Sequence, residues 1–373
     1  MPLRSSFQKH VLEFNFDART SRGIMKNRTS WFLKIWNESD PEIFGLGESA
    51  PLTGLSKETA EEVEEELTQL QHKINHSNFE LPAITNVADV HSYFSKIGIG
   101  SSYSSNLFAL ETAFLDLAKG GKRLLFDTDF ITGKAIPING LIWIGGMDKV
   151  LQQIDIKIKD GFKCIKLKVG GHDFEKECDI LQYIRRKYFR EDIVVRLDAN
   201  GAFRPEDALY KLNLLTKFNI HSIEQPIKPG NPFMEELCAK SPIPIALDEE
   251  LLGVEAMENR RSLLSRLKPQ YIILKPSLHG GLSSAAKWIV LANELKIGWW
   301  LTSSLESTIG LNAIAQFAST YPIELTQGLG MGTIYENNFP SPLVVKDSAL
   351  YYKPQIEWNL QHLYPREKLY IDE

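Results

Sequence analysis

Cysteine is scarce in this chain. Only three of its 373 residues are cysteines, and their spacing is not that of a zinc or redox site. An odd number leaves at least one thiol unpaired, so a framework built on disulfides is excluded. We therefore expect a protein of the reducing cytoplasm. The three residues are Cys164, Cys178 and Cys238.

Long hydrophobic runs and excess positive charge are also missing. No apolar run approaches the roughly 18 residues that a membrane helix needs, and the opening MPLRSSFQKH does not resemble a signal peptide. The 42 basic and 47 acidic residues leave a net charge of -5, whereas a general nucleic-acid binder is usually basic. Neither a membrane nor a nucleic acid is an expected partner. The composition, 43% hydrophobic and 24% charged, is that of a globular protein.

Short apolar runs recur along the chain from about residue 136. Their starts lie 22 to 30 residues apart, which is about the length of one strand followed by one helix. Segments 173–189, 205–218 and 282–296 lie in the gaps and carry apolar residues at helical intervals. Eight such units predict a closed parallel (β/α)8-type barrel. The runs begin near Ile136, Cys164, Val194, His221, Ile243, Tyr271, Trp299 and Glu324.

The first 130 residues follow a different pattern. Segments 10–18 and 29–38 are typical of antiparallel strands, and we expect an exposed loop over 19–28 between them. Segments 57–74 and 104–120 predict helices. Strands followed by helices indicate a separate α+β domain.

The predicted fold is therefore α/β with two domains. An α+β domain spans residues 1–130, and a barrel domain that carries the site spans 131–334. The tail 335–373 does not continue the barrel period, and we expect it to complete the first domain.

Charged residues stand at corresponding ends of five successive strands of the predicted barrel. Barrel enzymes carry their chemistry at the C-terminal strand ends. Side chains two positions apart share one face of a strand, so Arg196, Asp198 and Asn200 should all point inward. Three carboxylates and two lysines are thus predicted to converge. They are Lys168, Asp198, Glu224, Asp248 and Lys275.

Three converging carboxylates repel one another unless a cation lies between them. Oxygen ligands select a hard divalent ion, so we expect Mg2+, with Mn2+ also accepted, on Asp198, Glu224 and Asp248. Lys168 and Lys275 would lie near this ion and near each other. The positive charges should lower the pKa of both lysines enough for one of them to act as a base.

Two simpler interpretations compete with this one. A single charged residue at a strand end usually faces water, although five at corresponding ends argue against a solvated rim. A barrel without catalysis, used as a binding module, is the other alternative. Paired lysines beside a metal site argue against it, because mere binding has no use for them.

Five short motifs resemble the enolase superfamily, and within it the muconate-lactonizing subgroup. They are KLK (166–168), RLDAN (196–200), IEQP (223–226), LDE (247–249) and LKP (274–276). The resemblance covers nearly the whole chain and implies an enolase-like (β/α)7β barrel with an N-terminal capping domain. It also implies that a proton is removed beside a carboxylate, through an enediolate that Mg2+ stabilises.

The resemblance implies a role for each charged residue. Asp198, Glu224 and Asp248 would bind the metal, while Lys168 and Lys275 would form an acid/base pair on opposite faces of the substrate. The resemblance implies supporting roles for Lys166 and Asn200. From their places on the strands we also expect Arg196 to support the site, and Glu249 either to support it or to point outward.

Several loops are similar to those of the o-succinylbenzoate synthases of this superfamily. This implies a hydro-lyase that dehydrates the small anion 2-succinyl-6-hydroxy-2,4-cyclohexadiene-1-carboxylate to o-succinylbenzoate in menaquinone biosynthesis. Lys168 would take the proton and return it to the leaving hydroxyl, and Lys275 would stay charged. The similar segments are 20–23, 45–56, 139–145, 275–281, 301–307 and 327–343.

N-acylamino acid racemases and dipeptide epimerases of the superfamily use the same two lysines. Dipeptide epimerases usually carry Asp-x-Asp at the end of the eighth strand, where this chain has the neutral segment 326–330. Backbone N–H groups there, such as that of Gly328, would suit an anionic tail. The dipeptide alternative is therefore less favoured, while the racemase alternative and the oligomeric state stay open.

Three further residues are candidate substrate contacts. Arg22 lies in a predicted loop that would close over the barrel mouth, where its guanidinium would pair with a carboxylate or simply face water. Ser303 and Ser304 follow the seventh strand, where a hydroxyl either binds substrate or caps the next helix.

Overall fold

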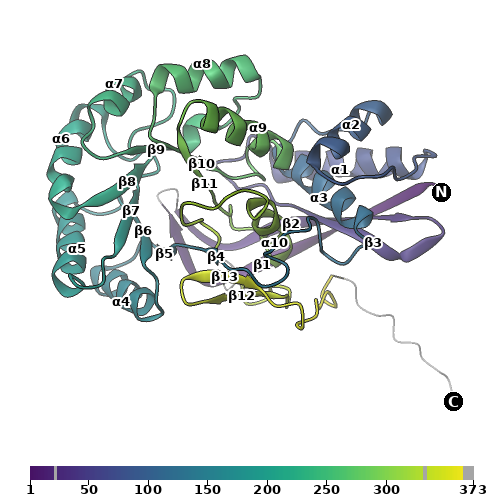
Figure 1. Cartoon of the computed structure of the whole chain (residues 1–373), viewed down its shortest axis with the longest axis horizontal. Helices are drawn as coiled ribbons and strands as arrows, with labels where there is room; N and C mark the ends of the chain where they lie inside the picture. The colour runs from purple at the N-terminus through teal and green to yellow at the C-terminus, as the bar shows by residue number, and fades with distance from the viewer. Residues whose placement is uncertain (21–22, 331–333, 364–373) are drawn as a thin grey trace.

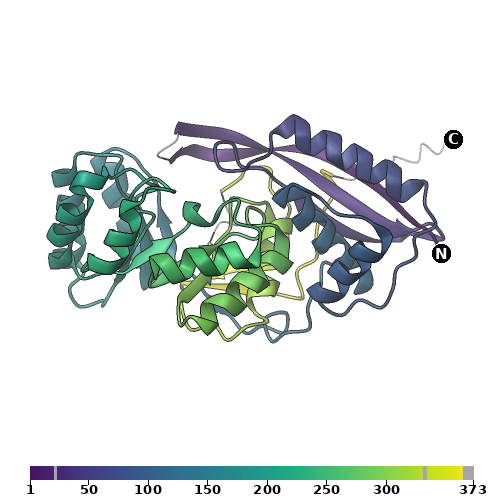
Figure 2. The same ribbon diagram turned by 90° about the horizontal axis from the view of Figure 1, so that it is seen from above.

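The computed structural model describes residues 1–20, 23–330 and 334–363 of the chain. Figure 1 shows the outer helices of the barrel at one end of the molecule and the N-terminal sheet with its helices at the other. Figure 2, turned by 90°, shows the N-terminal strands reaching toward the barrel. A site at the barrel mouth can therefore draw on both parts.

Three antiparallel strands, in the order β1–β2–β3, form the N-terminal sheet. β1 (Leu3–Thr20) pairs with β2 (Gly23–Asn37) along nearly its whole length, and β3 (Asp40–Ser49) lies beside β2. The loop predicted over 19–28 was wrong, because its described residues belong to these paired strands, although most of them are exposed as predicted. Main-chain hydrogen bonds continue the hairpin beyond the point where apolar alternation ends.

Three helices follow this sheet in the chain. α1 (Ala60–Asn75) and α3 (Ser104–Ala118) pack on the sheet, and α2 (Val87–Ile97) packs against α3. α3 approaches β3 closely because β3 carries glycines. A Cβ added at Gly45 would lie 1.8 Å from the carbonyl oxygen of Ala113 on α3. Any side chain there would push the helix away from the sheet.

Seven parallel strands form the barrel sheet, and two isolated pairings close it. Gln327 pairs in parallel with Ile138 beside the first strand, and Gly328 pairs with Thr302 just after the last. The segment predicted as the eighth strand thus fills the gap, and the barrel prediction is confirmed. The strands, in spatial order, are β5 (Gly140–Ile142), β6 (Cys164–Lys168), β7 (Val194–Asp198), β8 (Ile220–Glu224), β9 (Ile245–Leu247), β10 (Tyr271–Leu274) and β11 (Gly298–Leu301).

Helices follow the strands and cover the outside of the barrel (Figure 1). Pro205 opens α6 in its first turn, where the missing N–H has no helical partner to lose. The helices are α4 (Met147–Lys159), α5 (Phe174–Lys187), α6 (Pro205–Leu215), α7 (Phe233–Lys240), α8 (Met257–Leu267), α9 (Gly281–Glu294) and α10 (Thr308–Ala318), with short 3-10 turns η1 (Thr216–Phe218) and η2 (Glu249–Leu251).

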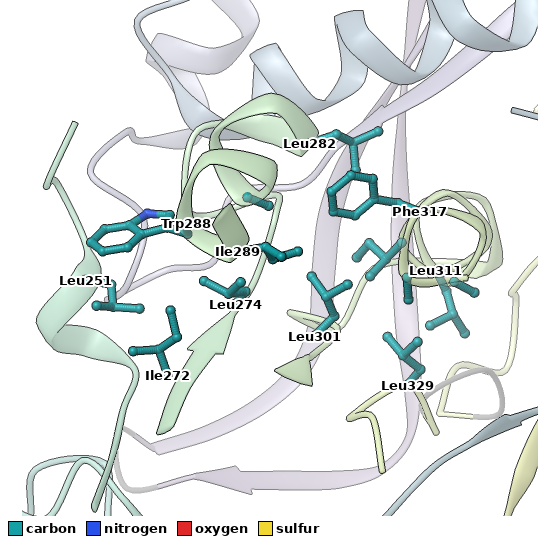
Figure 3. Packing of buried hydrophobic residues seen from close by; sticks show 14 of the residues in the cluster. Leu251, Ile272, Leu274, Leu282, Trp288, Ile289, Leu301, Leu311, Phe317 and Leu329 are labelled. Atoms are coloured by element: carbon teal, nitrogen blue, oxygen red, sulfur yellow. The ribbon is translucent and has the colours of Figure 1, made fainter. Parts of the chain in front are cut away.

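A continuous apolar layer lies between the strands and these helices. In Figure 3, Trp288 and Ile289 of α9 and Leu311 of α10 face the side chains of Leu274 and Leu301 on β10 and β11. All five residues have an exposed fraction of 0%. Close packing of this kind fixes the positions of the strand ends that carry the site.

The C-terminal segment makes contacts with both parts of the molecule. β12 (Leu343–Lys346) and β13 (Ala349–Tyr352) form a hairpin that pairs with β4 (Ile136–Pro137) at the barrel. Phe339 and Leu363 instead pack in an apolar cluster with residues of β2 and β3. The division at residues 130 and 335 stays a prediction.

Candidate active site

The charged side chains of β6, β7 and β8 stand at matching positions in the sheet. Lys168 lies opposite Asp198, and Asp198 lies opposite Glu224. Both carboxylates are about 2% exposed or less. Buried ionised groups need partners of opposite charge or hydrogen bonds, and the neighbouring lysines provide both.

Lys166 joins two of the carboxylates. Its Nζ donates to Asp198 Oδ2 and Glu224 Oε2, both at 2.8 Å. Burial disfavours the charged amine, but the two carboxylates outweigh it and raise the pKa of Lys166 above its usual value. Burial would raise the pKa of Asp198, but the charges of Lys166, Lys168 and Lys275 outweigh burial and hold that pKa below its usual range. These contacts favour the positively charged form of Lys166 within the site.

Lys168 has a looser set of contacts. Its Nζ donates to Asp198 Oδ2 at 2.9 Å and to Asn200 Oδ1 at 2.8 Å. Asn200 is oriented in turn, because its amide donates to Glu249 Oε1 at 3.0 Å. Its φ of 44° lies in the left-handed region, which asparagine tolerates better than most residues. Asn200 and Glu249 thus hold the amide oxygen toward Lys168.

Lys275 reaches the third carboxylate from the other side. Its Nζ donates to Asp248 and lies 3.8 Å from Glu224 Oε1. Burial opposes its charge, but Asp248 and Glu224 raise its pKa overall. Its backbone N–H donates to Nδ1 of His279. Burial, then the charges of Lys275 and Arg260, lower the pKa of His279 to about 3, so the ring stays neutral and can accept this bond.

The donor atoms fit a divalent metal ion. Three carboxylates supply only oxygen, the preferred ligand of hard cations. Glu224 Oε1 is buried and accepts no hydrogen bond in the described structure, so it has a lone pair to offer. Within the described ranges no three acidic, His or Cys side chains already enclose a metal-sized space. The ammonium groups of Lys166 and Lys275 lie between the carboxylates instead, as a bound cation would.

Gln225 positions Asp248, a role that the sequence did not reveal. Its Oε1 accepts from the backbone N–H of Asp248 at 3.2 Å and of Glu250 at 3.1 Å, and its amide donates to Glu250. Its φ of 38° is left-handed. The one available signal was its place beside Glu224 in the IEQP motif.

A cavity of about 660 Å3 opens above these side chains. Lys166, Lys168, Asp198, Asn200 and Lys275 line its floor. Its other walls come from β2 and from segment 51–61 of the N-terminal part, together with Leu141, Trp143 and the loop after β11. A cavity of this size accommodates a small organic molecule.

The remaining predicted residues lie in different places. Ser303, Ser304 and Gly328 line the cavity, but the N–H of Gly328 already donates to the carbonyl of Leu301 and is not available to an anion. Arg196 does not line it. The guanidinium of Arg196 lies inside the barrel, 3.9 Å from the ring centroid of Trp300, and donates to the carbonyl of Thr326.

One predicted contact, Arg22, lies outside the described residues. One buried residue, Arg28, was missed by sequence reasoning, whereas Glu306 had been singled out only by its place beside Ser303 and Ser304 after the seventh strand. Arg28 of β2 lines the cavity and donates to the carbonyls of Ser304 and Ala50. Glu306 accepts from Ser303, Ser304 and Ser277. The contacts of Arg28, and that of Glu306 with Ser277, join separate segments of the chain and leave no local pattern.

Comparison with known proteins agrees with this geometry. Residues 149–355 match the family model described as enolase C-terminal domain-like. The chain is 42% identical over 92% of its length to an o-succinylbenzoate synthase from Desulfotalea psychrophila, of which it covers 98%. The chain belongs to the enolase superfamily.

Solved structures of this superfamily have the same fold. The crystal structure of MenC from Desulfotalea psychrophila LSv54 matches with a TM-score of 0.84 at 37% identity, covering 94% of this chain and 100% of that one. Muconate lactonizing enzyme from Pseudomonas putida matches with a TM-score of 0.78 at 18% identity, covering 97% of this chain and 99% of that one. At this identity the match supports the fold alone.

Other enolase-superfamily relatives are more distant. L-Ala-D/L-Glu epimerase from Bacillus subtilis is 25% identical over 54% of this chain and 52% of its own length. Membership makes the chain an enzyme that acts on a small molecule with a divalent metal ion. Among the described residues no helix is long and apolar enough to cross a membrane.

Proposed function

We propose that this chain is an o-succinylbenzoate synthase, a hydro-lyase that dehydrates 2-succinyl-6-hydroxy-2,4-cyclohexadiene-1-carboxylate. The observation that carries the proposal is the 42% identity, over 92% of the chain, to a relative of that name. The epimerase relatives reach 25% to 32% identity over 43% to 58% of the chain. Free thiols at all three cysteines support a place in the cytoplasm.

Asp198, Glu224 and Asp248 would hold the metal, and Mg2+ is the ion we propose. When bound, it supplies positive charge that stabilises the negative charge gathering on the substrate carboxylate. Glu224 Oε1, which is buried and accepts no hydrogen bond in the described structure, supports this assignment. Lys166, bonded to two of the carboxylates, would orient them.

Lys168 is the proposed base. Its Nζ takes the ring proton beside the carboxylate and then gives that proton to the departing hydroxyl, which leaves as water. The ring thereby becomes aromatic, which supplies much of the driving force. Lys275 keeps its proton, and its charge offsets the negative charge that develops during proton removal. Its Nζ donates to Asp248 and lies 3.8 Å from Glu224 Oε1, and these contacts favour the charged form.

The substrate's anionic tail would lie beside the loop after β11. Ser303 and Ser304 line that region, and the Ser304 hydroxyl is buried with no hydrogen-bond partner in the described structure. Such an unsatisfied hydroxyl supports a contact with a substrate oxygen. Gly328 would contribute shape rather than an N–H.

A direct assay tests the proposal. The purified protein is mixed with Mg2+ and freshly made 2-succinyl-6-hydroxy-2,4-cyclohexadiene-1-carboxylate, and loss of the diene absorbance is followed with and without EDTA. Rapid EDTA-sensitive turnover is the expected result. Metal binding without turnover would refute the substrate. Solvent deuterium exchange into N-acylamino acids and dipeptides would then identify the alternative chemistry.

A further inference from the structure

The loop after β11 is held in a strained conformation at the cavity. Leu305 has a φ of 69°, a left-handed value that costs a non-glycine residue energy. Leu305, Ser303 and Ser304 all line the cavity. A strained loop persists only where its surroundings hold it. The contacts of this loop therefore show which residues fix its conformation.

Glu306 joins this loop to the loop after β10. The carboxylate accepts from the Ser303 hydroxyl and from the Ser304 N–H at 2.7 Å. Its other oxygen accepts from the hydroxyl of Ser277, two residues beyond Lys275. Glu306 is fully buried. Moving this carboxylate would therefore shift the serines and the Lys275 loop together.

Glu48 connects the same region to the N-terminal part of the chain. It lies on β3, is fully buried, and accepts from the Ser30 hydroxyl of β2 at 2.9 Å. It also accepts from the Ser307 N–H at 3.0 Å, the Ser307 hydroxyl at 2.6 Å and the Gly310 N–H at 3.0 Å. These last groups form the first turn of α10.

The position of this carboxylate suits a helix N-terminus. The first N–H groups of a helix have no partner within it and carry partial positive charge, so they favour an anion. The fit is close, because a Cβ added at Gly310 would lie 2.8 Å from Glu48 Oε2. Glu48 thus takes the place of solvent at the start of α10. The N-cap residue of that helix, Ser307, directly follows Glu306.

We propose that Glu48 is a positioning residue through which the N-terminal part of the chain sets the geometry of Lys275 and the Ser303–Ser304 pair. The hydrogen bonds run from Glu48 to Ser307, whose neighbour Glu306 binds both the serines and the Lys275 loop. The inference rests on the proposed function, because that function assigns chemistry to Lys275. It predicts that Glu48 and the start of α10 act on catalysis without touching the substrate.

The test compares Glu48→Gln with wild type and with the matched control Glu38→Gln. Glu38 is an exposed carboxylate of the same part of the chain, paired with Arg4. Gln at position 48 keeps the size but turns one acceptor into a donor facing N–H groups. We expect kcat to fall about 10- to 100-fold with KM changed less than about threefold, since misplacing a catalytic group costs rate. The control should match wild type.

Hydrogen–deuterium exchange provides a readout that does not depend on turnover. In Glu48→Gln, the backbone N–H groups of Ser304, Ser307 and Gly310 should exchange faster than in wild type, with unchanged circular dichroism. Wild-type kcat in a folded Glu48→Gln variant would overturn the proposal, whatever the exchange. If wild type does not turn over the substrate, the proposed function fails, and the exchange alone decides this inference: faster exchange supports it and unchanged exchange overturns it.

If Glu48→Gln does not fold, Gly310→Ala tests the proposal in its place. The added methyl would lie 2.7 Å from Glu306 Cβ and 2.8 Å from Glu48 Oε2, so it displaces both carboxylates of the proposed connection, while alanine itself favours a helix over glycine. A lower kcat in this variant would therefore come from displacement rather than from loss of helix propensity. Wild-type kcat and wild-type exchange in Gly310→Ala would overturn the proposal.

Discussion

Lys166 and Lys168 share one strand and one face but differ in what surrounds them. Lys166 donates to two carboxylates, which raise its pKa and keep it charged. Lys168 donates to one carboxylate and one neutral amide. A base must give up its proton near neutral pH. The lysine with fewer anionic partners is the better candidate.

Lys168→Arg tests this assignment. Arginine keeps the positive charge but does not deprotonate in proteins, so it cannot act as a base. We expect kcat for the proposed dehydration to fall by about 100- to 10,000-fold, the usual contribution of a positioned base. Circular dichroism and the melting temperature should stay close to wild type. Near-native turnover would show that another group takes the proton.

Asp116 of α3 makes stability depend on pH at a site far from the chemistry. It is fully buried, pairs with Arg123 at 2.9 Å and accepts from the Leu46 N–H. Burial raises its pKa from 3.8 to about 6, against the opposing effect of Arg123. The folded state therefore holds this proton more tightly than the unfolded state. The stabilisation from this group is complete below about pH 4 and is lost as the pH rises through about 6.

Asp116→Asn should remove that dependence. Relative to the variant, the wild type should lose up to about 3 kcal/mol of unfolding free energy between pH 4 and pH 6, from about 2 pKa units at 1.36 kcal/mol each. Urea unfolding of both proteins at four pH values measures the difference. Parallel curves for the two proteins would mean that Asp116 has an ordinary pKa.

Among the elements, α9 shows how packing supports the site. It follows the Lys275 loop and lies on the outside of β10 and β11 (Figure 3). Trp288 is its largest side chain and is fully buried, with the Arg260 guanidinium 4.7 Å from its ring centroid. The strand ends can be placed precisely only if this layer is filled.

Trp288→Ala should leave a large cavity in that layer. We expect the free energy of unfolding to fall by about 3 to 5 kcal/mol, the usual cost of such a truncation. Denaturant titration measures it, with Tyr210→Ala as control. Tyr210 is 67% exposed on α6, so its loss should change stability by less than about 0.5 kcal/mol. Equal effects of the two substitutions would contradict the burial of Trp288.

At the scale of the whole molecule, the cavity belongs to both parts of the chain. Its floor carries the ionised groups of the barrel, and its walls include β2 and segment 51–61. Ligands of the proposed metal come from β7, β8 and the residue after β9. An ion that binds all three stabilises the closed barrel, because the unfolded chain does not bring them together.

Divalent metal should therefore raise the melting temperature. At a Mg2+ concentration 100 times its dissociation constant, linkage adds about 2.7 kcal/mol of stability. Thermal melts with Mg2+ and with EDTA measure the shift, and Asp198→Asn should largely abolish it. A shift that persists in Asp198→Asn would place the metal elsewhere.

The sequence by itself determined the barrel, because eight apolar runs at near-constant spacing fit few other folds. It also predicted that Lys168, Asp198 and Glu224 meet, since parallel strands in register bring their ends together. Local alternation is enough for such predictions, and the motif resemblance named the family.

Other features depended on tertiary structure. The continuation of the β1–β2 hairpin into 19–28 was missed because its pairing comes from main-chain hydrogen bonds, which no side-chain pattern records. Arg196 shares a face with Asp198 yet lies deeper, against Trp300. Glu48 meets Ser307 across 259 residues of sequence. Only folding brings such groups within hydrogen-bond distance, so depth in the barrel and contacts between distant segments were decided by the three-dimensional packing alone.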